Sequence, residues 1–174
     1  TILVHASGFI QGDDAAINLG DMAQQLRAIH LLRKLFPEHR VITLANSMKE
    51  HPLPPSQGFI KNLPAYLGKN RPETVNRLLL PIKVLWLLVN AFLLRIFGGT
   101  LACHPEARKA LEGIRDSTFV FYAGAGPLNQ RYLRGVAALW LLTATLTRIL
   151  GTPLVLIGQQ IGPLKLNILN KLLF

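Results

Sequence analysis

Short apolar segments alternate with helical segments along most of the sequence, and this alternation limits the possible folds more than any other feature. The apolar runs that predict buried strands cover residues 1–6, 41–45, 118–123 and 154–157. Parallel strands that helices cover on both faces are apolar throughout, whereas half-exposed strands alternate with polar residues. The sequence therefore predicts an α/β fold, with a Rossmann-like parallel sheet and helices on both faces.

Apolar residues recur at helical spacing in four segments between these strands. The patterns predict helices over residues 22–36, 78–97, 105–114 and 128–150, and another helix that begins near Leu164. We expect Gly135 to kink or split the fourth helix. Residues 46–76 contain repeated prolines and predict irregular chain, which serves either as a substrate-facing loop or only as a connection.

Residues 78–97 form the most apolar part of the chain and approach the length of a membrane span. The segment nevertheless contains Lys83, Asn90 and Arg95. A basic residue near the centre of a spanning helix is costly. We therefore favour a buried helix, or one that lies on the membrane surface, over a spanning helix.

The charge balance indicates acidic partners. The chain has 174 residues, enough for one domain with a core, and carries 19 basic against 9 acidic residues, a net charge of +10. Such a chain favours nucleic acid, anionic lipid or phosphorylated substrates. The basic residues are scattered and form no stripe with aromatic residues, so we predict no nucleic-acid partner.

The single cysteine, Cys103, cannot form an internal disulfide, which fits a reducing, cytoplasmic compartment. Cys103 and His104 form a two-residue pair with no second cluster, and we interpret the pair as structural. No metal site is predicted.

Three glycine-containing segments follow predicted strands or precede predicted helices. They are residues 18–21, 124–126 and 158–163. Ligands of parallel sheets bind beyond the carboxyl ends of the strands, and the first turn of a helix offers free N–H groups there. Asp21 is a candidate helix N-cap with Gln24 as its capping-box partner, and equally a candidate ligand-binding residue.

These segments resemble the motifs of the polysaccharide pyruvyl transferase family. Asn18-Leu19-Gly20-Asp21 looks like the NxGD motif of the first loop in that family. Gly124-Ala125-Gly126 looks like its glycine triplet, with Ala125 in place of the middle glycine. Residues 158–163, GQQIGP, look like its GQxIGP motif. All three occur in the family's order.

The resemblance implies a two-domain, GT-B-like protein of which residues 1–174 are the Rossmann-like N-terminal domain, a fragment whose C-terminal domain is missing. Members transfer an enolpyruvyl unit from phosphoenolpyruvate to a sugar, which gives a pyruvate ketal on a surface polysaccharide or its precursor. The donor-binding residues and the acid/base histidine are expected mostly in the second domain. No cofactor is implied.

The resemblance also suggests site residues in this chain. Asp21 is the catalytic candidate, because it could orient or deprotonate a hydroxyl of the acceptor. The substrate-binding candidates are Asn18, Gly20, Gly124, Gly126, Gln159 and Gly162. The expected partners are phosphoenolpyruvate and a sugar or lipid-linked glycan.

Two other functions fit the same sequence. One is a GT-B glycosyltransferase that uses a nucleotide sugar, since the nucleotide then binds in the C-terminal domain. The other is a domain that binds the membrane surface through residues 78–97 and the basic charge, which would make the protein peripheral at the membrane.

Overall fold

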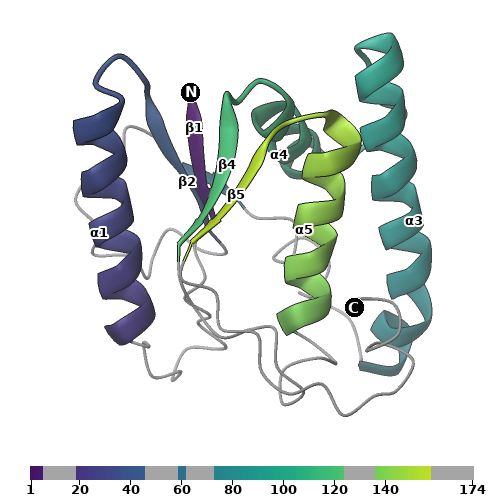
Figure 1. Ribbon diagram of the computed structural model, residues 1–174. Coiled ribbons are helices and arrows are strands. Elements are labelled where there is room, and N and C mark those ends of the chain that lie inside the picture. Colours follow the sequence, from purple (N-terminus) through teal and green to yellow (C-terminus); the bar gives the residue numbers. More distant parts are fainter. Residues whose placement is uncertain (6–18, 46–58, 62–72, 124–135, 158–174) are drawn as a thin grey trace, which may run out of the picture.

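The sheet forms the middle layer of the molecule, with helices packed on both of its faces (Figure 1). This computed structural model describes residues 1–5, 19–45, 59–61, 73–123 and 136–157. The elements in chain order are β1 (Ile2–His5), α1 (Leu19–Leu35), β2 (Val41–Ala45), β3 (Phe59–Lys61), α3 (Glu73–Phe97), α4 (Pro105–Arg115), β4 (Phe119–Ala123), α5 (Val136–Leu150) and β5 (Leu154–Ile157).

All strand pairs in the sheet are parallel, and the order is β3-β2-β1-β4-β5. The predicted Rossmann-like α/β architecture is therefore confirmed, with β1, β2, β4 and β5 where the apolar runs placed them. The prediction of irregular chain over residues 46–76 is wrong at two places. Phe59–Lys61 form the edge strand β3, and α3 begins at Glu73.

Helix α1 alone packs on one face of the sheet in the described part of the chain. Its buried residues Ala28, Ile29 and Leu32 meet Ile2 and Val4 of β1, and Phe121 of β4, in one hydrophobic cluster. The spacing of the three helical residues places them on one stripe of the helix. This cluster is the smaller of two cores.

The larger core lies on the opposite face, between the sheet and helices α3, α4 and α5 (Figure 1). Leu3 and Tyr122 contribute the strand side of this core, and the helix side includes Leu87, Leu111 and Leu146. Successive residues of β1 point to opposite faces, so Leu3 enters this core while Ile2 and Val4 enter the other.

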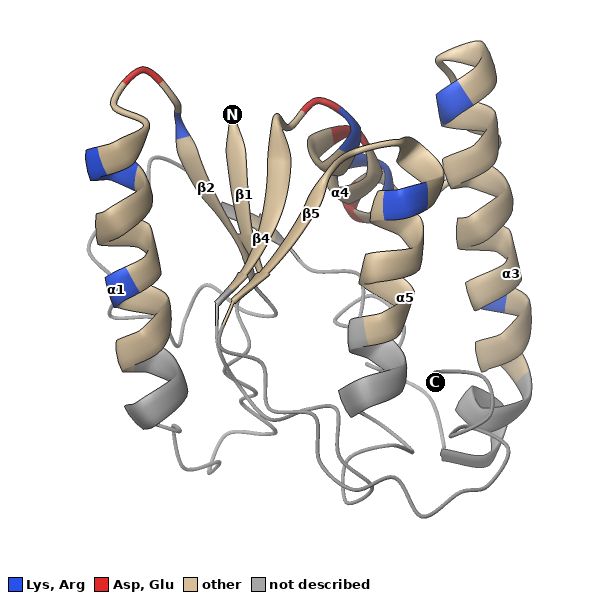
Figure 2. Cartoon of the chain, in the orientation of Figure 1, with Lys and Arg blue, Asp and Glu red and all other residues tan. Residues whose placement is uncertain are grey.

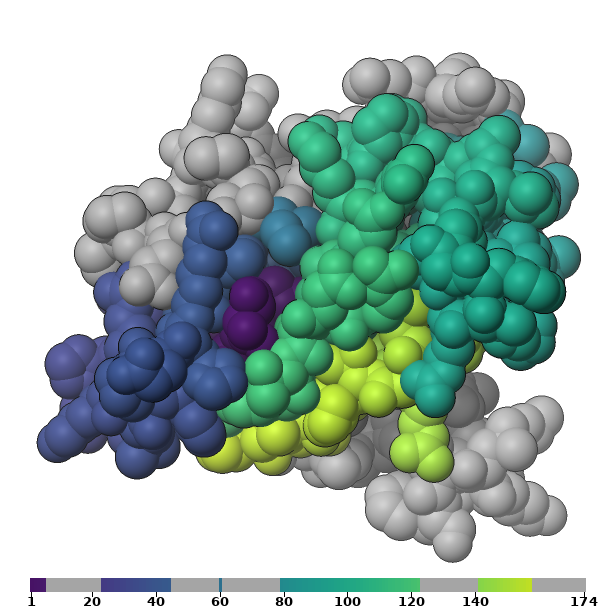
Figure 3. All heavy atoms as spheres, turned by 90° about the horizontal axis from the view of Figure 1, so that it is seen from above, coloured from purple at the N-terminus to yellow at the C-terminus, as the bar shows by residue number. Residues whose placement is uncertain are grey.

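Helix α3 packs against α4 and α5 at the outer side of this layer (Figures 1 and 3). It begins five residues before the predicted start at residue 78 and contains Pro81 in its interior. Proline removes one hydrogen bond from the helix. α5 begins at Val136 among the described residues, and the expected break at Gly135 and the predicted helical residues 128–135 and 164–174 lie outside the described residues.

Candidate functional site

The carboxyl ends of all five strands lie at one edge of the sheet, because every pairing is parallel. The chain runs outward from β1 to β2 and β3, then returns to place β4 on the other side of β1. The strand order thus reverses between β1 and β4. Ligands of open α/β sheets bind in the crevice beyond such a reversal. This edge, at the lower end of the strands in Figure 1, is the candidate site.

The first motif reaches this edge at the start of α1. The helix begins at Leu19, so Gly20 and Asp21 are its second and third residues. The prediction that Asp21 is the N-cap and that the helix begins at Met22 is therefore wrong. Backbone N–H groups in a first helical turn have no acceptor within the helix and can bind an anion or hydroxyl. Asn18 lies outside the described residues.

The other predicted site residues also lie outside the described residues: Gly124, Gly126, Gln159 and Gly162. The structure does define the strand ends that precede them. Ala123, the last residue of β4, pairs with Ile157, the last residue of β5. The second and third motifs therefore follow paired residues of two adjacent strands in the chain.

A stacked pair of aromatic rings, which sequence analysis did not identify, lies at the reversal itself. His5 of β1 and Tyr122 of β4 are in register, with ring centroids 4.2 Å apart and planes inclined by 9°. Both side chains are buried. Burial lowers the pKa of His5 to about 3. His5 is therefore neutral at physiological pH, and its ring stacks on Tyr122.

Burial raises the pKa of Tyr122 well above its ordinary value, although a side-chain hydrogen bond with Thr143 of α5 acts in the opposite direction. The phenol therefore stays protonated. His5, Tyr122 and Thr143 form a neutral, rigid connection between the strand ends and α5. This connection lies on the α5 side of the sheet, next to the carboxyl ends of β1 and β4.

Two buried polar side chains lie on the α1 face near the same edge. Gln25 belongs to the buried stripe of α1, and Thr43 pairs in register with Val4 of β1. Among the described residues, neither side-chain amide atom of Gln25 nor Oγ1 of Thr43 has a hydrogen-bond partner. A buried polar group without a partner costs about 1–3 kcal/mol, so these atoms are suited to receive water or a polar ligand.

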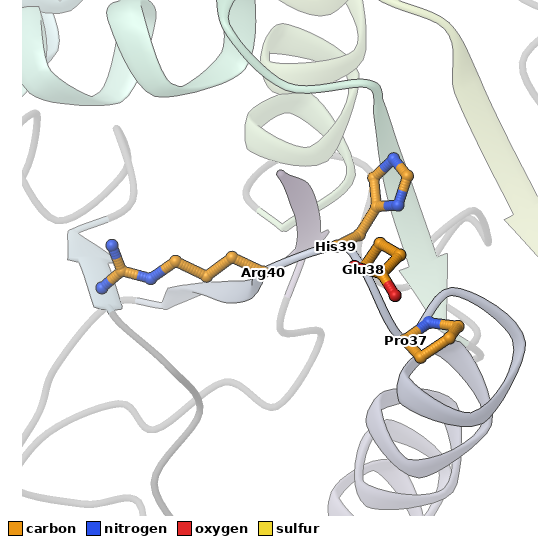
Figure 4. Close-up of a pocket in the computed structure, with 4 residues that line it drawn as sticks. All are labelled: Pro37, Glu38, His39 and Arg40. Carbon is orange, nitrogen blue, oxygen red and sulfur yellow. The ribbon is translucent and has the colours of Figure 1, made fainter.

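A surface pocket lies at the opposite edge of the sheet, in the turn between α1 and β2 (Figure 4). Its lining residues are Pro37, Glu38, His39 and Arg40. Figure 4 shows the Arg40 side chain directed away from Glu38 and His39, so the charged groups do not converge. His39 instead packs edge-on against Phe36 at 5.8 Å. The pocket is a feature of the turn rather than a second candidate site.

Cys103 and His104 lie at the start of α4. The Nδ1 atom of His104 accepts a hydrogen bond of 3.3 Å from the backbone N–H of Glu106 and caps the helix. His104 therefore has the structural role that we predicted for the pair, whereas the same role for Cys103 stays a prediction. The described part of the chain has no group of three or more His, Cys, Asp or Glu residues that could hold a metal ion.

Comparisons of the chain with protein-family models, with curated proteins and with solved structures gave no match. The fold and the strand-edge geometry define the class of protein. It is a Rossmann-like α/β domain whose candidate ligand site lies beyond the carboxyl ends of β1, β4 and β5.

Proposed function

We propose that the chain is the acceptor-side domain of a pyruvyl transferase, which moves an enolpyruvyl unit from phosphoenolpyruvate to a sugar of a surface polysaccharide or its precursor. One observation carries the proposal. The segments that resemble the family's motifs follow β1, β4 and β5, which are neighbours in the sheet and end at one edge. With a different strand order, the three segments would follow strands that are not adjacent in the sheet.

The chemistry divides between the two domains of such an enzyme. One acceptor hydroxyl adds to C2 of the enolpyruvyl group. The methylene carbon of the enolpyruvyl group takes a proton at the same time and becomes a methyl group. A second hydroxyl then attacks the same carbon, and phosphate leaves. The acceptor hydroxyls must be oriented and relieved of their protons, and the donor must be protonated. The proposal assigns the first task to this domain and donor binding to the second.

Within this domain, Asp21 would orient or deprotonate an acceptor hydroxyl. Its position in the first turn of α1 supports this role, because the helix begins at the candidate edge. Asn18 and Gln159 would hydrogen-bond the sugar. Gly20, Gly124, Gly126 and Gly162 would leave the backbone bare, which allows close approach of a ligand.

The test uses the full-length protein that carries this domain, incubated with phosphoenolpyruvate and a panel of glycan and lipid-linked acceptors. We expect phosphate release that depends on the acceptor, together with a ketal-bearing product identified by mass spectrometry. Asp21→Asn should lower kcat/KM by about a hundredfold, the usual contribution of a general base. Glu38→Gln, which removes an exposed carboxylate at the opposite edge, is the matched control and should leave the rate unchanged.

Transfer from a nucleotide sugar, with no reaction of phosphoenolpyruvate, would replace the proposal by the GT-B glycosyltransferase alternative. A folded protein that is inactive with every donor and acceptor in the panel would also count against a pyruvyl transferase. Equal rates for Asp21→Asn and wild type would refute the role of Asp21 alone.

A further inference from the structure

Helix α3 has an apolar face that the other described residues leave uncovered. We call this the outer face, and its exposed residues include Ile82, Leu85, Trp86, Val89, Phe92, Ile96 and Phe97. Their spacing follows one side of the helix over about 22 Å, at 1.5 Å per residue. Figure 2 shows α3 with few charged residues along its length. An exposed apolar surface of this extent indicates a site that binds another protein or a membrane.

The opposite face of α3 is part of the protein core. Leu87, Ala91 and Leu94 are buried in the larger core with residues of α4 and α5. Asn90 is buried on the same face and donates from Nδ2 to the carbonyl oxygen of Trp86 at 2.9 Å. α3 is therefore anchored in the domain through its inner side between Leu87 and Leu94.

The anchoring decides how this helix meets a membrane. Residues Leu79–Phe97 are long and apolar enough to cross a bilayer. Crossing would carry α4 with it, because the two helices share the core, and α4 presents the exposed charged residues Arg108 and Lys109. Lying in the plane of the membrane immerses only the outer face and leaves the core intact.

Charge selects an anionic lipid surface over a second copy of the chain as the occupant of the outer face. From residue 74 to residue 97 the helix has no acidic residue, and the chain carries a net charge of +10. Arg95 is exposed beside the outer face, and Arg148 is exposed on the neighbouring α5. Two copies joined through this face would bring like charges together, whereas anionic headgroups would attract them.

The aromatic residues of the outer face also suit the boundary between headgroups and acyl chains. Phe92 and Phe97 supply apolar rings, and Trp86 combines an exposed ring with a polar N–H. Nε1 of Trp86 donates to the carbonyl oxygen of Ala102 at 3.2 Å, so its hydrogen bond is satisfied within the protein. The ring can therefore enter the boundary without leaving an unpaired donor.

We infer that the outer face of α3 binds the surface of an anionic membrane, with the helix lying in the plane of the bilayer. This inference is independent of the sugar chemistry proposed above. It would bring the candidate site to a lipid surface and so favour an acceptor that is linked to lipid.

Flotation with lipid vesicles tests the inference on the chain itself. We expect binding to vesicles of equal parts phosphatidylcholine and phosphatidylglycerol, weaker binding to phosphatidylcholine alone, and a decrease with added salt. Leu85→Glu combined with Phe92→Glu should weaken binding at least about tenfold, because apolar contact is lost and negative charge is added. The matched control is Leu35→Glu on α1, since Leu35 and Leu85 are 60% and 62% exposed.

A second measurement avoids the risk that the glutamate variant unfolds. The chain has two tryptophans, so Trp140→Phe leaves Trp86 as the only one. Nitroxide-labelled lipids should quench Trp86 fluorescence in the bound state. Absence of both binding and quenching would overturn the inference. If Leu35→Glu loses as much binding as the α3 variant, charge attraction alone causes the binding and α3 does not dock. If the chain forms a dimer that Leu85→Glu dissociates, the occupant of the outer face is a second copy of the chain.

Discussion

At the scale of single residues, the His5–Tyr122 pair shows how the strand edge is built. An imidazole and a phenol at the ends of adjacent strands are buried together and stacked, instead of facing solvent as polar groups at a ligand edge often do. Stacking brings the faces of the two rings into contact, and burial keeps both rings neutral. The edge therefore has a rigid, uncharged base on the α5 side.

The buried histidine predicts a dependence of stability on pH. Burial lowers the pKa of His5 from 6.5 to about 3, so between these values the unfolded chain binds a proton that the folded chain excludes. Above about pH 6.5, His5 is neutral in both states and does not lower the free energy of unfolding. As the pH falls toward 3, protonation of the unfolded chain lowers the free energy of unfolding by up to about 1.4 kcal/mol per pH unit. Urea unfolding between about pH 7 and pH 5 should show this decrease.

His5→Leu should flatten the slope, although the variant starts from a lower stability because the stacked pair is lost. His30→Gln replaces an exposed histidine of α1 and should retain the slope of the wild type. If His5→Leu and wild type lose stability equally on acidification, other groups cause the acid sensitivity and the assignment to His5 fails.

Residue types and their places along the strands were predictable, but their pairing was not. His5 and Tyr122 both lie in apolar runs that predict strands, yet they are far apart in the sequence. Only the register between β1 and β4 makes them neighbours. The burial of Gln25 escaped prediction for the same kind of reason, because a single glutamine in a helix is usually exposed and only packing against the sheet buries it.

At the scale of elements, the sequence predicted every described helix and strand except the short strand β3. β2 and β5 have the predicted bounds, and α4 extends one residue beyond its predicted end. β3 has three residues, too few to show a period, and exists because it pairs with β2 and packs under α4. The side chain of Ile60 in β3 lies so close to Gly113 of α4 that a Cβ atom at residue 113 would clash with Cδ1 of Ile60.

The orientation of α3 could not be read from the sequence, because both of its faces are apolar. The same substitution, leucine to alanine, at Leu87 and at Leu85 tests directly which face of α3 is buried. Leu87 is 1% exposed and Leu85 is 62% exposed. Leu87→Ala should lower the free energy of unfolding by about 2–5 kcal/mol through the lost contacts and the cavity left behind.

Leu85→Ala should change the free energy of unfolding by less than about 0.5 kcal/mol, as exposed substitutions usually do. Chemical denaturation of both variants gives the comparison. Equal costs at the two sites would mean that the outer face is covered in solution. That result would also remove the basis for membrane docking through this face.

At the scale of the whole molecule, the two cores share one sheet. β1 is the central strand, and it contributes Ile2 and Val4 to the α1 side and Leu3 to the α5 side. Loss of packing on one face therefore exposes a strand on which the other face depends. This arrangement predicts that the described layers unfold as one cooperative unit.

The strand order is also the level at which the candidate site becomes visible. The sequence predicts that ligands bind at carboxyl strand ends, but it cannot show which ends are adjacent. The order β3-β2-β1-β4-β5 places β1 between β2 and β4 and so locates the reversal. The motifs supply the proposed chemistry, and the sheet supplies the common edge from which they start.

The tryptophans make the predicted cooperativity measurable, because Trp86 belongs to α3 and Trp140 to α5, on the side of the sheet opposite α1. Ile29→Ala removes a buried side chain from the α1 side and should cost about 2–5 kcal/mol. If the molecule is one unit, tryptophan fluorescence and far-ultraviolet circular dichroism should show the same lowered midpoint. Leu31→Ala, at an exposed neighbouring position, is the control and should shift neither signal. A fluorescence midpoint that stays at the wild-type value while circular dichroism reports early loss of helix would mean that α1 separates before the rest of the sheet unfolds.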